Sequence, residues 1–518
     1  MTGRSPARSF LTIVLPFAAS AALAGTAAQA NDPGICSHAP QREANGSRAP
    51  AAVTAYLDAL VGKARFDQRD ACATWAGTYS DRRRHADDEA RGEPVPARFI
   101  VFPTAALGLQ ALAARLQRNP HIYSVETASR FVVVSFDRRI STQKLRQILA
   151  DPTVDYAEPD CDGPDFLTTS IEALDFGSEG SGCWKRAARD SYPNDPCIDE
   201  LWGHAKIGWN SGIAARSLPR IVAVLDSGID ASHEDLADSV MMNVDPGEPP
   251  RSQGSRLNAR CATSGRCYPH GTEMAGTIGG RMDNGIGVAG VAPNSLLLPI
   301  VISRVDHGLL ARLSTIAEGI DAAVRGGADV INISAKWPVD SRAISMAIYA
   351  AVGGDSSGRR LVVTGYATSL QRDESVREYY PSRYRCLSGV LAAVPTDMRG
   401  RDLFNPAGRP TATDGRIQAP GVDIVVTTTE NSERGYALSE AAGASSAAAY
   451  VSGAVALVWG SPPLNKCDAQ QIKQLLFCRS KTSSTSRYPW INVDFLGELG
   501  KVDAGADCHT AMQALGCT

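Results

Sequence analysis

The sequence predicts an α/β protein in which a doubly wound parallel sheet follows a small α+β domain. Two observations carry this prediction. From residue 221 onward, short apolar runs alternate with helical patterns, which is typical of parallel sheets covered on both faces. Between residues 96 and 161, the patterns follow the order βαββαβ, which is the ferredoxin-like arrangement. With 518 residues, 44% of them hydrophobic, the chain is long enough for more than one domain.

Residues 1–30 are typical of a secretory signal peptide. Arg4 and Arg8 precede a largely apolar stretch at 10–23, and small residues at 28–30 resemble a cleavage site. The alternative is a membrane anchor, but the uninterrupted apolar core is short and no later segment has the length of a membrane span. We therefore expect a periplasmic or extracellular protein with no membrane span in its mature form.

The small domain follows an extension at 31–95, which is polar and Ala-rich and carries no recognisable chemistry. The strands of the small domain are expected at 97–102, 121–127, 130–137 and 153–160, and its helices at 106–117 and 141–150. Residues 162–190 contain several glycines without clear periodicity, so we expect a linker.

The larger domain is expected at 191–507. Its buried strands are predicted at 221–225, 296–302, 329–333, 361–364, 390–394 and 424–427. A helix is expected at 468–477, and a Cys-bearing tail at 508–518.

The 12 cysteines agree with export, because an even number in an oxidising compartment predicts disulfides. Their pairing stays open. Cys161 and Cys183 could pair across the linker and tether the small domain after cleavage, or each could pair within its own domain. No CxxC spacing occurs, so we expect neither a metal site nor a cofactor. The net charge of −3 and the lack of long Lys/Arg runs argue against a nucleic-acid partner.

Three polar residues stand where a nucleophilic triad requires them. Asp226 follows the apolar run at 221–225, so it lies at the carboxyl end of a strand, the edge where α/β sheets carry their sites. His270 in HGTEMAGTIGG and Ser445 in AGASSAAAYVSG each stand at the start of a helix of small residues. A serine attacks an amide only with a base in reach, and a carboxylate must orient that base.

Each of these residues has a competitor nearby. Ser446 adjoins Ser445, and a serine at a helix start is most often a cap. His233 and Asp230 lie in the loop after Asp226, where a structural role suffices. The glycine, threonine and small-residue helix that follow His270 favour it over His233.

With these motifs, the chain resembles the subtilisin-like serine peptidases, the subtilases. The resemblance extends over PNDPCIDELWGHAKIGWN (193–210), GADVINIS (327–334), APGVDI (419–424) and GKVDAGAD (500–507), the last of which resembles the family's closing helix. It implies a parallel sheet of the subtilisin type and an endopeptidase that acts on protein or peptide substrates. It also implies that residues 96–161 are a propeptide, which assists folding and inhibits the enzyme until the linker is cut.

The chain also departs from the family pattern. Where subtilases place an oxyanion-binding asparagine in a motif resembling AAGN, the stretch LVVTGYATSL puts Thr368, a weaker donor. The SLGG-like substrate-binding segment is replaced by Ser334, Ala335 and Lys336, and Glu273 stands where a second histidine is common. Subtilases often bind structural calcium, but no acidic loop here is clear enough to assign ligands.

These departures leave three functions open. The intact triad favours an active endopeptidase made as a zymogen. A catalytically impaired pseudopeptidase that binds peptides in the same cleft is the first alternative. A chaperone or inhibitor whose working part is residues 97–160 is the second, but it leaves the triad unexplained.

Overall fold

The computed structural model describes Cys72 and most of the chain from residue 97 onward. The described ranges are 97–137, 139–161, 182–241, 269–302, 311–353, 360–370, 376–403, 415–428, 435–439, 443–482 and 488–517. The signal peptide expected at 1–30, the extension apart from Cys72, and the linker before residue 182 lie outside these ranges.

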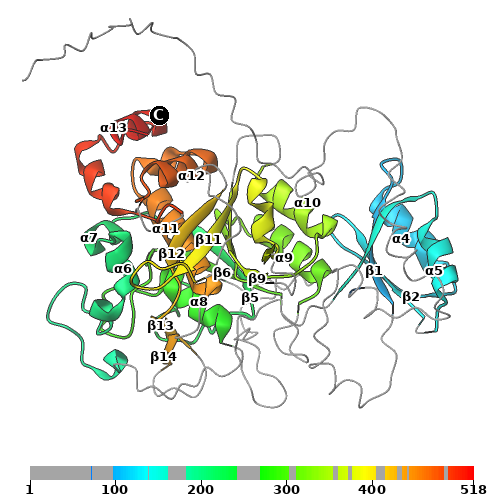
Figure 1. The fold of residues 1–518 in the computed structure, drawn as a ribbon, viewed down its shortest axis with the longest axis horizontal. Helices are drawn as coiled ribbons and strands as arrows, with labels where there is room; N and C mark the ends of the chain where they lie inside the picture. Colours follow the sequence, from blue (N-terminus) through cyan, green and yellow to red (C-terminus); the bar gives the residue numbers. More distant parts are fainter. Residues whose placement is uncertain are drawn as a thin grey trace, which may run out of the picture.

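The first domain has the βαββαβ order that the sequence predicts (Figure 1). Its elements are β1 (Arg98–Pro103), α4 (Leu109–Gln117), β2 (Ile122–Thr127), β3 (Val132–Phe136), α5 (Thr142–Leu149) and β4 (Val154–Pro159). The strands form one sheet in the order β2-β3-β1-β4, and all neighbours are antiparallel. This topology is ferredoxin-like.

The two central strands of this small sheet, β3 and β1, are buried on both faces, but against different partners. Successive side chains of a strand point to opposite faces. Val132 and Val134 therefore pack with the domain's own helices. Val133, together with Ile100 and Phe102 of β1, belongs to a second apolar cluster that includes helices of the larger domain. Burial on both sides explains why β3 is an almost continuous apolar run.

The larger domain is built on a parallel sheet of six strands in the order β12-β11-β8-β7-β5-β6. The strands are β5 (Ile221–Asp226), β6 (Leu296–Val301), β7 (Val330–Ile333), β8 (Leu361–Gly365), β11 (Val390–Thr396) and β12 (Arg416–Pro420). The first five were predicted from their apolar runs, and the structure confirms them.

Helices cover both faces of the large sheet (Figure 1). One face carries α8 (His270–Gly279) and α11 (Ala444–Gly460), and the other carries α9 (Leu313–Arg325) and α10 (Arg342–Ala351). The alternation along β5 matches these two layers, because Val224 packs with the first pair and Leu225 with the second. The small domain lies against α9 and α10 (Figure 1).

The remaining elements lie around this core. They are α6 (Trp202–Ile207), α7 (Ser211–Ala214), β9 (Thr368–Leu370), β10 (Val376–Glu378), β13 (Ile424–Thr427), β14 (Tyr436–Ser439), α12 (Ala469–Cys478), α13 (Cys508–Ala514) and the 3₁₀ turns η1 (Cys183–Lys185), η2 (Ile198–Glu200), η4 (Ser382–Cys386), η5 (Leu464–Lys466) and η6 (Asp494–Lys501). No helix in the described part of the chain is long and apolar enough to cross a membrane.

Two sequence predictions about this domain were wrong. The run at 424–427 is a strand, but β13 pairs antiparallel with β14 instead of joining the large sheet. Its place in the large sheet is taken by β12. This strand was not predicted, because Arg416 and Gln418 interrupt its apolar pattern. The closing helix expected at 500–507 is also displaced. Asp507 accepts a hydrogen bond from the N–H of Thr510 and so caps α13, which begins only at Cys508.

The disulfides contradict the proposed link between Cys161 and Cys183. Four bonds lie within the described residues: Cys72–Cys161, Cys183–Cys197, Cys467–Cys508 and Cys478–Cys517. Cys161 is buried at the end of β4 against α9, whereas Cys183 belongs to a separate cluster around Tyr436. A cut in the linker therefore leaves no tether between these two cysteines. Cys161 is joined to the N-terminal extension instead.

Candidate active site

The site begins at the carboxyl end of β5, where Asp226 is fully buried. The N–H of Ser227 donates to Asp226 Oδ1 at 2.7 Å, and Nδ1 of His270 lies 2.9 and 2.8 Å from the two carboxylate oxygens. This contact fixes the imidazole, because a hydrogen bond at Nδ1 leaves Nε2 as the acceptor. The structure therefore brings Asp226 and His270 together as the sequence predicts.

Gly271 permits this close approach of α8 to the strand end. A Cβ atom at this position would lie 2.2 Å from the carbonyl oxygen of Gly228, so a larger residue would push the helix away. The N–H of Gly271 also donates to Oγ of Ser227 at 3.1 Å. The glycine after His270 is thus a geometric requirement of the Asp–His pair.

His270 is poised to hold a proton. Burial disfavours the charged imidazolium, but the charge and hydrogen bond of Asp226, with the charge of Glu273, outweigh it and raise the pKa of His270 to about 9. An imidazole acts as a general base only in its neutral form. The free enzyme is therefore expected to act best at alkaline pH.

Replacement of Glu273 by glutamine is expected to move the pH profile of kcat/KM. Glutamine is isosteric but removes a negative charge that stabilises the imidazolium, so the pKa of His270 falls. The rising limb should shift to lower pH by a fraction of a pH unit, with little change in its plateau. Glu498→Gln, on the distant turn η6, is the matched control. A rising limb that stays in place would show that Glu273 does not act on His270.

Ser445 is the second residue of α11, after Ala444. Its Oγ donates to the carbonyl oxygen of Ser334 at 3.4 Å, and Ser334 Oγ donates to the carbonyl oxygen of Ser445 at 3.4 Å. No hydrogen bond joins the described atoms of Ser445 and His270. Catalytic contacts of this kind are often long without substrate. The helices that carry the two residues, α8 and α11, pack against each other.

The backbone N–H groups of the first turn of α11 have no partners within the helix, and the helix dipole favours negative charge there. No side chain caps this end, because its N-cap is Gly443. The arrangement can therefore stabilise an oxyanion that develops beside Ser445.

The competitors have other roles in the structure. His233 bonds the backbone through both ring nitrogens: Nε2 lies 2.7 Å from the carbonyl oxygen of Gly435, and Nδ1 accepts from the N–H of Asp235 at 3.1 Å. Asp230 accepts from the N–H and hydroxyl of Ser232 in its own turn. Ser446 is 2% exposed, compared with 8% for Ser445.

The predicted substrate segment leaves β7 directly beside Ser445. Ser334 and Ala335 are buried, and Lys336 is half-buried with Nζ 5.4 Å from the ring centroid of Tyr379. Thr368 is half-buried at the start of β9, where it pairs with Glu378. No contact of Thr368 with the triad is resolved among the described residues.

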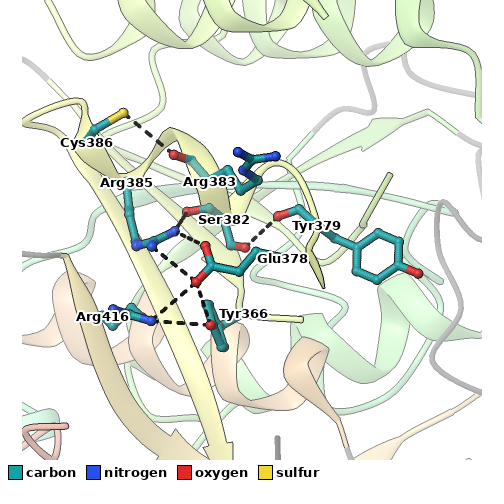
Figure 2. Close-up of polar contacts among 8 residues, drawn as sticks. All are labelled: Tyr366, Glu378, Tyr379, Ser382, Arg383, Arg385, Cys386 and Arg416. Atoms are coloured by element: carbon teal, nitrogen blue, oxygen red, sulfur yellow. Dashed lines mark hydrogen bonds and ion pairs between the residues drawn. The ribbon is translucent and has the colours of Figure 1, made fainter. Parts of the chain in front are cut away.

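Two groups of supporting residues were not found from the sequence. Asn332 is fully buried in β7, where it donates to Ser334 Oγ and accepts from Ser452 Oγ, both at 2.9 Å. It thereby ties α11 to the central strand. A lone amide in the apolar run VINI was the available signal. The second group surrounds Glu378 (Figure 2), which contacts Tyr366, Arg385 and Arg416 from three different segments.

Within the described residues, no group of three or more His, Cys, Asp or Glu side chains is arranged to hold a metal ion. The geometry at the sheet edge is that of acid–base and nucleophilic chemistry: a buried carboxylate, an oriented imidazole and a serine at a helix start.

A comparison with protein-family models matches residues 220–488 to the Subtilase family. The chain belongs to the subtilase family. It is 34% identical to subtilisin from Bacillus pumilus over 244 residues, which are 47% of this chain and 77% of that protein. Subtilisin E from Bacillus subtilis is 33% identical over 244 residues, and the match spans 56% of its length.

Among solved structures, the chain is similar to fervidolysin from Fervidobacterium pennivorans, described as a keratinolytic enzyme related to subtilisin. The TM-score is 0.53 at 21% identity, and the match covers 78% of this chain and 61% of fervidolysin. This likeness supports the subtilisin-type fold. Membership of the subtilase family supports a serine-type peptidase.

Proposed function

We propose that the protein is an exported serine endopeptidase, made as a zymogen, in which Ser445 attacks the peptide bond. His270 takes the serine proton and passes it to the leaving amine, and Asp226 orients the imidazole. The observation that carries the proposal is the buried Asp226–His270 pair beside the helix that begins at Ala444 and Ser445. The disulfides support an oxidising compartment.

A fluorophosphonate probe tests this assignment, because it reacts with a serine only when the serine is activated. We expect the mature protein to be labelled on the peptide that contains Ser445. A folded protein that hydrolyses no peptide and takes no label would contradict the proposal. It would support the pseudopeptidase, which is favoured by Thr368 and by the bond from Ser445 to Ser334.

We assign residues 96–161 to the propeptide, 162–190 to a linker that contains the processing site, and 191–507 to the catalytic domain. The assignment is supported by hydrogen bonds that join the end of β4 to the first turns of α9 and α10. Asp160 accepts from the N–H and hydroxyl of Ser314, at 2.9 and 2.7 Å, in the first turn of α9. Glu158 accepts from Oγ of Ser341 at 2.7 Å and from the N–H of Arg342 at 2.8 Å, at the start of α10. Two carboxylates at the end of β4, one in the strand and one directly after it, thus cap two helices of the other domain.

Ionic and cation–π contacts surround these caps. Arg130 pairs with Asp321 of α9 at 3.0 Å. The guanidinium of Arg342 lies 5.5 Å from the ring centroid of Phe102 and 4.9 Å from that of Tyr156. With the apolar cluster beneath, these contacts support a propeptide that is docked before processing and remains bound after it.

Replacement of both Glu158 and Asp160 by alanine is expected to weaken this docking. Each helix cap is worth about 1 kcal/mol, so the loss of two corresponds to roughly thirtyfold in the dissociation constant. The measurement is the activity of the freshly processed protein on serial dilution, where the variant should become active at higher concentration than wild type. Glu158→Ala alone should lie between them, and Asp151→Ala, which pairs with Arg115 within the small domain, is the control. Identical dilution curves for all four proteins would show that the contacts of Glu158 and Asp160 do not contribute to binding of the small domain.

A further inference from the structure

Four buried side chains form a continuous chain of hydrogen bonds between β7 and α11. The hydroxyl of Ser452 donates to Oδ1 of Asn332 at 2.9 Å, and Nδ2 of Asn332 donates to Oγ of Ser334, also at 2.9 Å. Ser334 Oγ donates to the carbonyl oxygen of Ser445 at 3.4 Å, and Ser445 Oγ donates to the carbonyl oxygen of Ser334 at the same distance. The chain of bonds therefore begins in α11, crosses to β7 and returns to α11 at the proposed nucleophile.

The spacing of these four residues explains why they meet. Asn332 and Ser334 are two positions apart, so their side chains point to the same face of the sheet, which α11 covers. Ser445 and Ser452 are seven positions apart, about two turns, so they lie on the same side of α11. Two points of the helix are thus tied to two points of the strand. This arrangement fixes the rotation of α11 about its own axis.

The two bonds of Asn332 supply most of this constraint. The contacts between Ser334 and Ser445 are long for hydrogen bonds, whereas the bonds of Asn332 have an ordinary length. Asn332 is fully buried between Ile331 and Ile333, at a position where a hydrophobic residue would need no polar partner. A buried amide whose partners lie on two elements permits one arrangement of them, so it defines the position of the helix relative to the strand.

Close backbone packing at the start of α11 adds a second constraint. A Cβ atom at Gly365, at the end of β8, would lie 2.7 Å from the carbonyl oxygen of Ala444. This contact sets how closely the helix approaches the sheet. The rotation of the helix, and with it the direction of the Ser445 side chain, is set by the bonds of Asn332.

We propose that Asn332 and Ser452 are positioning residues, which hold α11 in the rotation that directs Ser445 Oγ at the attacked carbonyl. The inference rests on the proposed peptidase function, in which Ser445 is the nucleophile. Neither residue is bonded to Ser445 directly, so each acts through Ser334 and through the helix. Their loss therefore lowers the rate of attack and leaves peptide binding nearly unchanged, because a displacement of about 1 Å at a reacting group costs up to about a hundredfold in rate.

Two substitutions test the proposal. Ser452→Ala removes one hydroxyl, and Asn332→Leu replaces the amide by an apolar side chain of similar size. After self-processing is complete, each protein is mixed with a fluorophosphonate probe, and both the rate constant and the endpoint of labelling are measured. We expect the rate constant to fall about tenfold in Ser452→Ala and up to about a hundredfold in Asn332→Leu, with the endpoint unchanged. For a peptide substrate, kcat should fall by the same factor while KM stays within about twofold.

Two buried residues elsewhere provide matched controls. Ser461→Ala, at the far end of α11, removes a hydroxyl that donates to the carbonyl oxygen of Leu457 at 2.7 Å. Asn492→Leu removes an amide that donates to the carbonyl oxygen of Arg479 at 3.0 Å. Both controls lose a buried hydrogen bond outside the chain of bonds that reaches Ser445. They should therefore keep the labelling rate constant of the wild type, even where fewer molecules are folded.

The endpoint separates a positioning role from a purely structural one. If Asn332→Leu and Ser452→Ala lower the endpoint but keep the wild-type rate constant, the two residues only stabilise the fold, which would overturn the inference and leave the peptidase function intact. The double variant should be little slower than Asn332→Leu alone, since Ser452 acts through the amide. Additive losses would contradict this single chain of bonds. A wild type that takes no label would contradict the proposed function, and the inference with it.

Discussion

Replacement of Ser445 by alanine is expected to abolish peptide hydrolysis, with kcat lowered by about a million-fold, the loss known for subtilisin itself. The hydroxyl oxygen of Ser445 is the proposed nucleophile, and His270 is the base proposed to take its proton. His270→Ala should cost about as much. The double variant should be little worse than either single one, because the residues act as a unit. The measurement is kcat and KM for one peptide with all three variants.

Ser446→Ala is the matched control for this experiment. Its side chain is more deeply buried than that of Ser445, so its loss should change kcat only slightly. Full fluorophosphonate labelling of Ser445→Ala would move the nucleophile elsewhere, and Ser446 would be the first residue to test. Additive losses in the double variant would show that Ser445 and His270 do not act together.

Replacement of Thr368 by asparagine is expected to raise kcat by about tenfold to a hundredfold, with little change in KM. Removal of the corresponding asparagine costs about 10²–10³ in subtilisin itself, and a threonine hydroxyl is a shorter donor. The gain should appear in kcat because the oxyanion exists mainly in the transition state. Thr368→Val, which keeps the shape and removes the hydroxyl, is the control and should not raise kcat.

An unchanged or lower kcat in Thr368→Asn would mean that the oxyanion is held by other donors, such as the first turn of α11, or that another step limits the rate. This outcome would also remove the main sequence argument for a pseudopeptidase, because the missing asparagine would then carry no penalty.

Strands such as β3 and β5 could be predicted because they are buried on both faces, which produces continuous apolar runs at 132–134 and 221–225. β12 could not, because Arg416 and Gln418 are buried polar residues that interrupt the apolar pattern of the strand. The error in the position of the last helix, at 508–514, has a local cause. An aspartate such as Asp507 can be the last residue of one helix or the N-cap of the next.

The three candidate catalytic residues could be proposed individually because each stands in a motif dictated by local geometry. Gly271 is required by the carbonyl of Gly228, and Gly365 by the backbone of Ala444. The contact between Lys336 and the ring of Tyr379 could not be predicted from the sequence. It depends on the backbone pairing of Trp337 with Tyr380, which joins two separate segments. The contacts of Glu158 and Asp160 with the larger domain could not be predicted either. A helix cap that comes from another domain leaves no pattern in the sequence around the helix.

The central claim is that this chain is a zymogen activated by its own Ser445. The most direct measurement is mass spectrometry of the chain expressed without residues 1–30, in parallel with its Ser445→Ala variant. We predict that wild type cuts itself between Cys161 and Pro193 and that the variant remains uncut under the same conditions. An uncut wild-type chain, or the same cut in both proteins, would contradict the claim.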